Sequence, residues 1–370
     1  MEDILGKEEI DFVPPKAMNN NLDIDRELEQ ILKQHSARIK VIGVGGGGGN
    51  TTSRMHEIGI RGGEIIAINT DAQDLLYARA DQKILIGREI SRGLGAGSNP
   101  QIGREAAREQ LTEIKKKLSN SDMVFVTCGL GGGTGTGAAP VVAEVAKSMG
   151  ALVIGVVTLP FSVEGSKRIE NAMEGLEQME GIVDTLIVIP NDKLLDLAPN
   201  LPLPTAFKVA DEILTNAVKG ITELITSSGL VNLDFADIKA VMANGGVSLI
   251  GMGESDTTDR VTEAVNKALN NPLLDVDIKD AQGALVNVIG GNNLALEEYN
   301  QAVQLIGERL SPTAKLISGA KISQDMDKGL KIMVIITGVK SPQISGERIP
   351  IGEAKRKEIE NELGIEFFES

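Results

Sequence analysis

Two glycine-rich segments constrain the fold of this chain more than any other feature, because each follows a short β-branched run and precedes a helical pattern. In the first, the expected strand Ile39–Val44 leads into five consecutive glycines, with a helix expected from Thr51. The GxGxxG spacing that begins at Gly43, followed by Asp71 at the end of the next expected strand, favours an NAD-dependent enzyme. The alternative is a tight turn without a ligand, but five glycines lose more backbone entropy than a turn requires.

The second glycine-rich segment, Gly129–Gly137, lies between an expected strand, Met123–Thr127, and an expected helix, Ala138–Met149, with Pro140 in its first turn. Glycines allow backbone N–H groups to converge on phosphate oxygens, and the helix N-terminus adds the positive end of its dipole. No Lys-Ser or Lys-Thr pair follows either segment, so neither is a Walker A loop. Together with a third glycine-rich stretch, Arg92–Pro100, the pattern predicts a cradle for a triphosphate and its metal.

Strands alternate with helical segments in the first half of the chain, which is typical of βαβ units and a mostly parallel sheet. A long amphipathic segment, Leu203–Ser227, predicts a central helix between this Rossmann-like α/β domain and a second, smaller α+β domain. We therefore expect an N-terminal extension (1–37), a nucleotide-binding domain (38–202), the central helix (203–229), a second domain (230–340) and a tail (341–370). The remaining strands are expected at Glu64–Asn69, Leu152–Val157, Thr185–Ile189, Val247–Gly251, Ala284–Ile289, Ala314–Ile322 and Leu330–Thr337, and helices at Thr257–Leu269 and Leu294–Leu310.

Composition excludes several classes of protein. The chain has 370 residues, with 37 Lys and Arg against 52 Asp and Glu, so its net charge at pH 7 is −15. That charge repels nucleic acids and anionic lipids, and a chain without tryptophan offers little surface for base stacking. The single Cys128, with only His35 and His56, supports neither a disulfide nor a zinc site. An acidic start and the lack of a long apolar run predict a cytoplasmic protein with no direct membrane insertion.

Several motifs, in order along the chain, carry a resemblance to a known superfamily. Gly131–Gly137, which reads Gly-Gly-Gly-Thr-Gly-Thr-Gly, resembles the signature loop of tubulin and FtsZ. Asn69–Gln73, Arg92–Pro100 and Asn232–Asp237 resemble FtsZ in particular. The resemblance runs nearly continuously from about residue 39 to residue 339, and the short tail with its Gly-Ile pair resembles the archaeal type.

This resemblance implies a tubulin/FtsZ fold, GTPase activity, and binding of GTP or GDP with magnesium. The metal would be held by the phosphates and water rather than by a protein cluster. The chain departs from many FtsZ proteins at Gly49, where they carry an asparagine. The residues expected to bind nucleotide are Gly45, Gly46, Gly47, Gly48, Gly49, Asn50, Asp71, Ala96, Gly97, Gly132, Gly133, Thr134, Gly135, Thr136, Gly137, Glu164, Arg168, Asn191, Phe207 and Asp211.

Phe207 and Asp211 are four residues apart and therefore share one helix face. A ring that stacks on a purine beside a carboxylate favours guanine, whose N1–H and N2–H2 are adjacent donors. The alternative is a core phenylalanine beside a solvated charge, and the resemblance favours guanine contacts. Glu164 and Arg168 resemble the family's ribose and phosphate contacts, with a weak surface ion pair as the alternative.

The segment Asn232–Asp237 precedes an expected helix, and Asp234 with Asp237 three residues later is also a plausible N-cap arrangement. In FtsZ this loop completes the nucleotide site of the next subunit, so the resemblance makes Asn232, Asp234 and Asp237 the candidate catalytic residues. The carboxylates would orient the attacking water. The implied function is a GTPase that polymerises head to tail and forms the division ring.

The apolar end of the tail, Leu363–Phe368, resembles the peptide by which FtsZ proteins dock on a membrane-tethering adaptor, in archaea the SepF type. Packing of the tail on its own domain is the alternative. Two other functions compete with the polymerising GTPase. A nicotinamide oxidoreductase is favoured by Gly43–Gly48 but lacks a proton-transfer residue, and a scaffold without turnover would require Asp234 and Asp237 to be helix caps alone.

Overall fold

The computed structural model describes residues 37–60, 62–197, 202–226, 230–231, 233–271, 278–279 and 281–339. The chain divides into two units, Met1–Ala37 and Arg38–Ser370, and every helix and strand reported below belongs to the second. The described part of the chain contains no helix that is long and apolar enough to span a bilayer.

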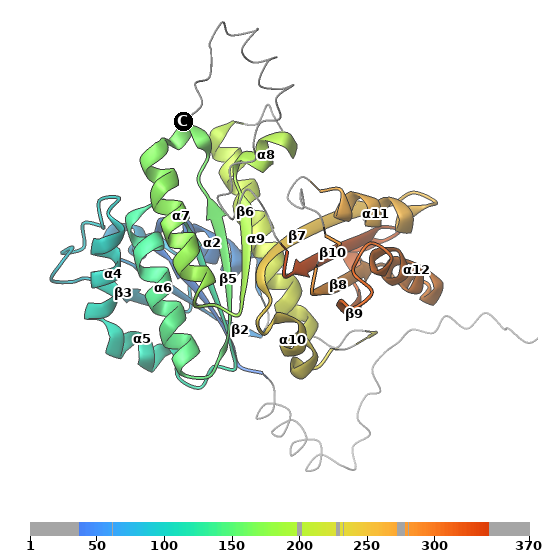
Figure 1. Ribbon diagram of the computed structural model, residues 1–370, viewed down its shortest axis with the longest axis horizontal. Helices are drawn as coiled ribbons and strands as arrows, with labels where there is room; N and C mark the ends of the chain where they lie inside the picture. Colours follow the sequence, from blue (N-terminus) through green and yellow to red (C-terminus); the bar gives the residue numbers. More distant parts are fainter. Residues whose placement is uncertain are drawn as a thin grey trace, which may run out of the picture. The chain divides into compact units, whose positions relative to one another are not determined.

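Ten strands in the described residues form one sheet (Figure 1). Their order across the sheet is β3-β2-β1-β4-β5-β6-β7-β10-β8-β9. The sheet is therefore continuous from the first half of the chain to the second. The strands are β1 Ile39–Val44, β2 Gly63–Asn69, β3 Gln82–Leu85, β4 Met123–Gly129, β5 Leu152–Leu159, β6 Thr185–Pro190, β7 Gly246–Ser255, β8 Gly283–Gly290, β9 Lys315–Ile322 and β10 Leu330–Thr337.

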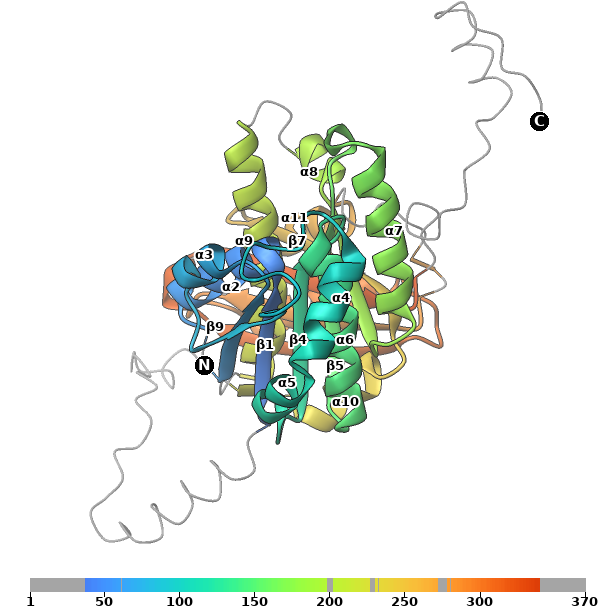
Figure 2. The same ribbon diagram turned by 90° about the vertical axis from the view of Figure 1, so that its left-hand side faces the viewer.

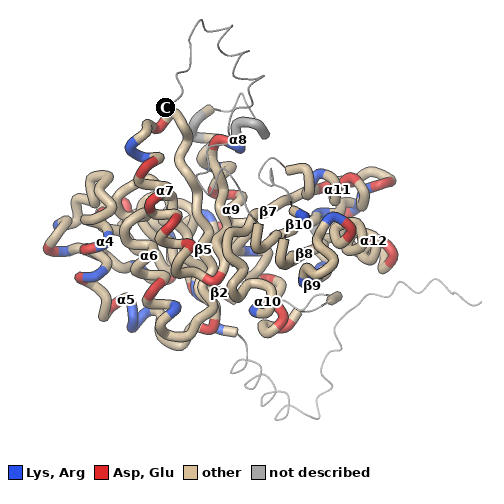
Figure 3. Tube along the Cα trace, in the orientation of Figure 1, with Lys and Arg blue, Asp and Glu red and all other residues tan. Residues whose placement is uncertain are grey.

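The first six strands are all parallel to their neighbours and are covered by helices on both faces (Figures 1 and 2). One face carries α2, α3 and α9, and the other carries α4, α5, α6 and α7. Strands β4, β5 and β6 contain no charged residue, as two-sided burial requires, and charges lie instead along the helices (Figure 3). The helices are α2 Gly45–Ile58, α3 Ala72–Tyr77, α4 Pro100–Glu109, α5 Leu111–Leu118, α6 Gly133–Ser148, α7 Ser166–Glu180, α8 Asp192–Leu197, α9 Leu203–Thr226, α10 Phe235–Met242, α11 Arg260–Leu269 and α12 Leu296–Gly307.

The second group of strands is joined to the first through β6 and β7. These two strands are parallel and pair over three residues, from Thr185 with Gly246 to Ile187 with Ser248. Beyond β7 the sheet is mixed, because β10 is antiparallel to both β7 and β8, and β8 is parallel to β9. The expected α/β class with a second α+β part is confirmed, whereas the continuity of the sheet was not foreseen.

Both helix starts expected after the glycine segments are wrong. Helix α2 begins at Gly45 rather than at Thr51, and α6 begins at Gly133 rather than at Ala138. Pro140 consequently lies in the interior of α6 instead of in its first turn. The physical reason is tertiary packing: a Cβ on the glycine at position 137 would stand 1.9 Å from the carbonyl oxygen of Pro100 in α4, so close contact favours glycine inside this helix despite its low propensity.

A glycine in β7 gives a stability test that does not involve the glycine segments. A Cβ on Gly253 would stand 2.1 Å from the carbonyl oxygen of Ala264 in α11, so Gly253→Ala forces the helix off the strand. We expect the free energy of unfolding, measured by denaturant titration, to fall by about 1–3 kcal/mol. Gly181 is the matched control, because its φ is −68° and an added Cβ would be 3.6 Å from the nearest atom. Equal unfolding midpoints for the two alanine variants would contradict this packing account.

Candidate functional site

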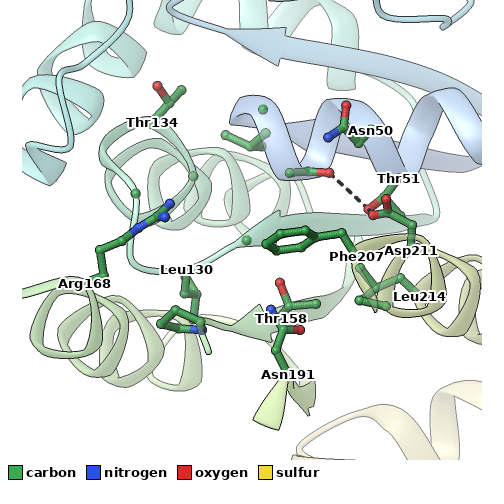
Figure 4. A pocket seen from close by; sticks show the side chains of 18 of the residues that line it. Asn50, Thr51, Leu130, Thr134, Thr158, Arg168, Asn191, Phe207, Asp211 and Leu214 are labelled. Atoms are coloured by element: carbon green, nitrogen blue, oxygen red, sulfur yellow. Dashed lines mark hydrogen bonds between the residues drawn. The ribbon is translucent and has the colours of Figure 1, made fainter. Parts of the chain in front are cut away.

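A cavity of about 400 Å³ lies at the carboxyl ends of β1, β4 and β5, where open α/β sheets bind their ligands (Figure 4). Helices α2 and α6 begin at its wall, and α9 closes the side opposite α6. The lining residues are Val44, Gly46, Gly47, Asn50, Thr51, Gly129, Leu130, Gly132, Gly133, Thr134, Gly135, Thr158, Pro160, Glu164, Arg168, Asn191, Phe207, Ala210, Asp211 and Leu214.

One end of the cavity is formed by two helix N-termini that no side chain caps. Neither Val44, the N-cap of α2, nor Gly132, the N-cap of α6, makes a side-chain cap hydrogen bond, and neither first turn contains an acidic residue. By contrast, Asp71 and Asn99 cap α3 and α4 with their side chains. Uncapped first-turn N–H groups and two converging helix dipoles make this end of the cavity an anion site.

Two threonines fix the loop around the start of α6. The hydroxyl of Thr136 accepts a hydrogen bond of 2.8 Å from the backbone N–H of Gly131, and this threonine is buried. The hydroxyl of Thr134 lies 2.6 Å from that of Thr70 at the end of β2. Thr136 therefore shapes the loop from inside, whereas Thr134 lines the cavity.

The other end of the cavity presents an aromatic ring and amide and carboxylate oxygens. Phe207 is 41% exposed and packs edge-on against Phe161, with ring centroids 5.3 Å apart. Asp211 accepts a hydrogen bond of 2.7 Å from the hydroxyl of Thr51, and burial raises the pKa of Asp211 above its ordinary value. Oδ1 of Asn191 is buried without a hydrogen-bond partner in the described chain. An unsatisfied buried acceptor is costly, so a ligand donor at this wall of the cavity would stabilise it.

Arg168 is the one basic side chain among the described residues lining the cavity. It forms an ion pair with Glu164, four residues earlier, and Glu164 also accepts a hydrogen bond of 2.8 Å from the backbone N–H of Phe161. The guanidinium group extends from α7 towards the start of α6 (Figure 4). Glu164 and Arg168 therefore line the cavity and also form an ion pair.

The structure brings together twelve of the residues expected to bind nucleotide, which are Gly46, Gly47, Asn50, Gly132, Gly133, Thr134, Gly135, Glu164, Arg168, Asn191, Phe207 and Asp211. Eight others do not line the cavity, namely Gly45, Gly48, Gly49, Asp71, Ala96, Gly97, Thr136 and Gly137. Sequence reasoning missed Thr51, Thr158 and Leu214. Helical spacing could have identified Leu214, because it lies three residues after Asp211 and therefore shares its helix face.

The expected catalytic carboxylates lie away from the cavity of their own chain. Asp234 caps α10 by accepting a hydrogen bond of 2.8 Å from the N–H of Asp237, and both residues are exposed. Asn232 lies outside the described residues. Asp211 stands fifteen residues before the end of α9, which corresponds to roughly 20 Å of helix, and α10 follows beyond that end (Figure 1). The helix-cap interpretation is thus correct for Asp234, and it leaves both carboxylates exposed.

Comparison with known proteins places the chain in a family. Residues 38–199 match the model of the tubulin/FtsZ family GTPase domain, and residues 246–340 match that of the FtsZ family C-terminal domain. The cell division protein FtsZ 1 of Thermococcus kodakarensis is 57% identical over 344 residues, which are 92% of this chain and 92% of the relative. That of Methanocaldococcus jannaschii is 57% identical over 317 residues, which are 86% of this chain and 87% of the relative. The chain belongs to the tubulin/FtsZ family of GTPases, and within it to FtsZ.

Solved structures agree with this assignment. An empty FtsZ dimer from M. jannaschii superposes with a TM-score of 0.82 at 56% identity, covering 85% of this chain and 92% of that one. A GTPγS-bound protofilament of CetZ2 from Haloferax volcanii gives a TM-score of 0.72 at 21% identity, covering 88% of this chain and 99% of that one, and so shares the fold. The resemblance and the GTPase activity inferred from it are confirmed, and the oxidoreductase interpretation is abandoned.

The two uncapped helix N-termini predict how affinity depends on phosphate number. Guanosine, GMP and GDP should bind with increasing affinity, and GDP should bind at least about tenfold more tightly than guanosine, a difference of about 1.4 kcal/mol. Phe207→Ala is the reference variant, because losing the ring should weaken all three ligands by a similar factor. Isothermal titration calorimetry measures both effects. Equal affinities for guanosine and GDP would mean that the helix N-termini contribute nothing.

Proposed function

We propose that this chain binds GTP in the cavity, polymerises head to tail and hydrolyses GTP only where the next subunit completes the site. One observation carries the proposal. The cavity combines an anion site with the Phe207 ring and the Asp211 carboxylate, yet Asp234 and Asp237 are exposed beyond the far end of α9. Asp234 and Asp237 therefore cannot orient water at a terminal phosphate held in the cavity of their own chain. A second copy, docked with its α10 end over the cavity, supplies them.

Within one chain, the residues divide the nucleotide among them. The N–H groups at the starts of α2 and α6 bind phosphate oxygens, and Phe207 stacks on the base. Asp211 accepts hydrogen bonds from N1–H and N2–H2 of guanine, while Asn191 offers its unsatisfied oxygen. Glu164 and Arg168 contact the ribose and the phosphates.

Magnesium fits this arrangement as an ion carried by the nucleotide. Among the described residues, no group of three or more His, Cys, Asp or Glu side chains could hold a metal. Mg²⁺ commonly keeps several waters and binds substrate phosphates, so it needs no such cluster. When bound, it neutralises charge on the transferred phosphoryl group.

Hydrolysis then follows from positioning. Asp234 and Asp237 of the incoming subunit hold a water in line with the terminal phosphate and accept its proton as GTP and water become GDP and phosphate. Head-to-tail contacts that do not close generate an open filament. Loss of the terminal phosphate removes contacts at the subunit boundary, so GDP weakens the filament and hydrolysis times its disassembly.

The cellular role proposed here is that of the relatives, which are named cell division proteins. We propose a cytoplasmic filament at the division site, near the inner face of the membrane, that builds the division ring. The tail, residues 341–370, lies outside the described residues. Its apolar end, Leu363–Phe368, is proposed to bind a membrane-tethering adaptor of SepF type.

Steady-state GTP hydrolysis with magnesium, recorded with light scattering against protein concentration, tests the completed site. Specific activity should rise from near zero above a threshold concentration at which scattering also appears. Asp237→Ala should lower the maximal rate by about 100-fold or more, because a water-orienting base is lost. Activity per chain that does not change with concentration would overturn the completed site.

A mixture of two impaired variants, one weakened in hydrolysis and the other in nucleotide binding, tests the completed site more sharply. Asp237→Ala keeps its cavity and Phe207→Ala keeps its carboxylates, so a mixture should hydrolyse GTP faster than either variant alone. Asp234→Asn separates catalysis from capping, because asparagine caps helices as well as aspartate does. It should lose activity while its unfolding midpoint stays at the wild-type value, and full activity in this variant would leave Asp234 as a cap alone.

Truncation tests the tail. A chain that ends at Glu362 should lose its affinity for an adaptor of SepF type and keep its assembly-dependent GTP hydrolysis, because the cavity and Asp237 are untouched. Replacing Phe367 and Phe368 by serine in the full-length chain is the milder variant. Undiminished adaptor binding by the truncated chain would refute this docking role.

A further inference from the structure

One hydrogen bond joins the helix at the phosphate end of the cavity to the helix at its base end. Oγ1 of Thr51 in α2 donates to Oδ1 of Asp211 in α9 across 2.7 Å (Figure 4). Thr51 is 1% exposed and Asp211 is half-buried, so the donor of this bond is shielded from water. Within the described chain no hydrogen bond reaches Oδ2 of Asp211, and this oxygen stays available to a ligand.

The hydroxyl of Thr51 has a second acceptor within reach, the carbonyl oxygen of Gly47 at 3.1 Å. A hydroxyl has one proton and donates to one acceptor at a time. An ionised carboxylate is the stronger acceptor, and the shorter distance is that to Asp211. The Thr51 hydroxyl therefore holds the Asp211 carboxylate through Oδ1. This contact limits rotation of the Asp211 carboxylate.

Charged side chains lie near Asp211 on α2, on α9 and across the nucleotide cavity. Arg54 and Glu57 of α2, with Lys208 and Glu212 of α9, line a neighbouring cavity that Asp211 also borders. Glu164 and Arg168 face it across the nucleotide cavity. Burial raises the pKa of Asp211, while the Thr51 hydroxyl and the positive charge of Arg54 act in the opposite direction.

We propose that Thr51 is a positioning residue for guanine recognition, whose hydroxyl orients the Asp211 carboxylate so that it accepts both N1–H and N2–H2 of the base. Thr51 lies six residues after the first residue of α2, so the helix that presents its N-terminus to the phosphates also sets the geometry of base recognition. The inference rests on the proposed function, because it requires that Asp211 contacts guanine. It adds a group that touches no ligand atom and acts through Asp211.

The test compares three single variants with the wild-type chain by GDP binding. Thr51→Val removes the hydroxyl and keeps the side-chain shape, whereas Thr51→Ser keeps the hydroxyl and removes a methyl group. Thr52→Val is the matched control: Thr52 is fully buried in the same helix, but its hydroxyl bonds the carbonyl oxygen of Gly48 at 2.9 Å and does not reach Asp211. Thermal unfolding without nucleotide shows whether each variant folds.

Three ligands and a pH series give readouts that a merely structural role does not move. We expect Thr51→Val to weaken GDP about tenfold, or about 1.4 kcal/mol, and to leave ADP unchanged. IDP lacks the 2-amino group, so Thr51→Val should weaken IDP binding less than GDP binding. The ratio of the two affinities should therefore be smaller than in the wild-type chain. Affinity for GDP falls as Asp211 becomes protonated, and without the Thr51 hydroxyl this fall should begin at a higher pH, because a bond that stabilises the charged form is gone.

Thr51→Ser should behave as wild type in affinity, ligand preference and pH profile. The proposal is overturned if Thr51→Val and Thr52→Val give the same GDP affinity and pH profile, or if Thr51→Ser loses as much as Thr51→Val. An equal loss for GDP, IDP and ADP would also overturn it, because that pattern reports a displaced helix. Failure of the proposed function is distinct, since the wild-type chain would then bind no guanine nucleotide.

Discussion

The structure depends on how closely α2 and α6 approach the strands from which they start. A Cβ on Gly45 would lie 2.8 Å from the backbone nitrogen of Gly135, and one on Gly48 would lie 2.5 Å from the carbonyl oxygen of Thr127 in β4. Gly45 also has a φ of +73°, a conformation that side chains other than glycine rarely adopt. Only glycine permits these contacts, and the contacts bring two uncapped helix N-termini to one cavity.

The sequence was sufficient to predict the parallel sheet, and the glycine segments that it singled out do border a cavity, because both features follow from local pattern. Strands such as β4 are continuous apolar runs, and glycine segments after strands indicate phosphate sites. The same reasoning failed for helix starts, since glycine has low helix propensity and only the tertiary contact at Gly48 explains why α2 begins before it. The short edge strand Gln82–Leu85 was not predicted, because four residues of mixed polarity show no clear hydrophobic periodicity.

The side-chain contacts that could be predicted were likewise those between residues close in the sequence. Phe207 and Asp211 were found because their relation is local, one helical turn apart. Thr51 was missed because its partner is 160 residues away, a separation that no single-sequence period encodes. Asp234 was interpreted in two ways, as a cap and as a water-orienting group, and the observed cap bond leaves its carboxylate exposed and so compatible with both roles.

A chain with a net charge of −15 that binds a polyphosphate must create its positive potential locally. Among the described lining residues, Arg168 is the one basic side chain, and its charge is already paired with Glu164. Most of the attraction therefore comes from backbone N–H groups at the starts of α2 and α6, whose dipoles do not titrate. The opposite end of the cavity is different, because Asp211 is a half-buried carboxylate and this partial burial raises its pKa. Protonation can therefore change the protein's own contacts at the Asp211 end, whereas at the anion site the protein's N–H donors do not titrate and only the ligand's phosphate does.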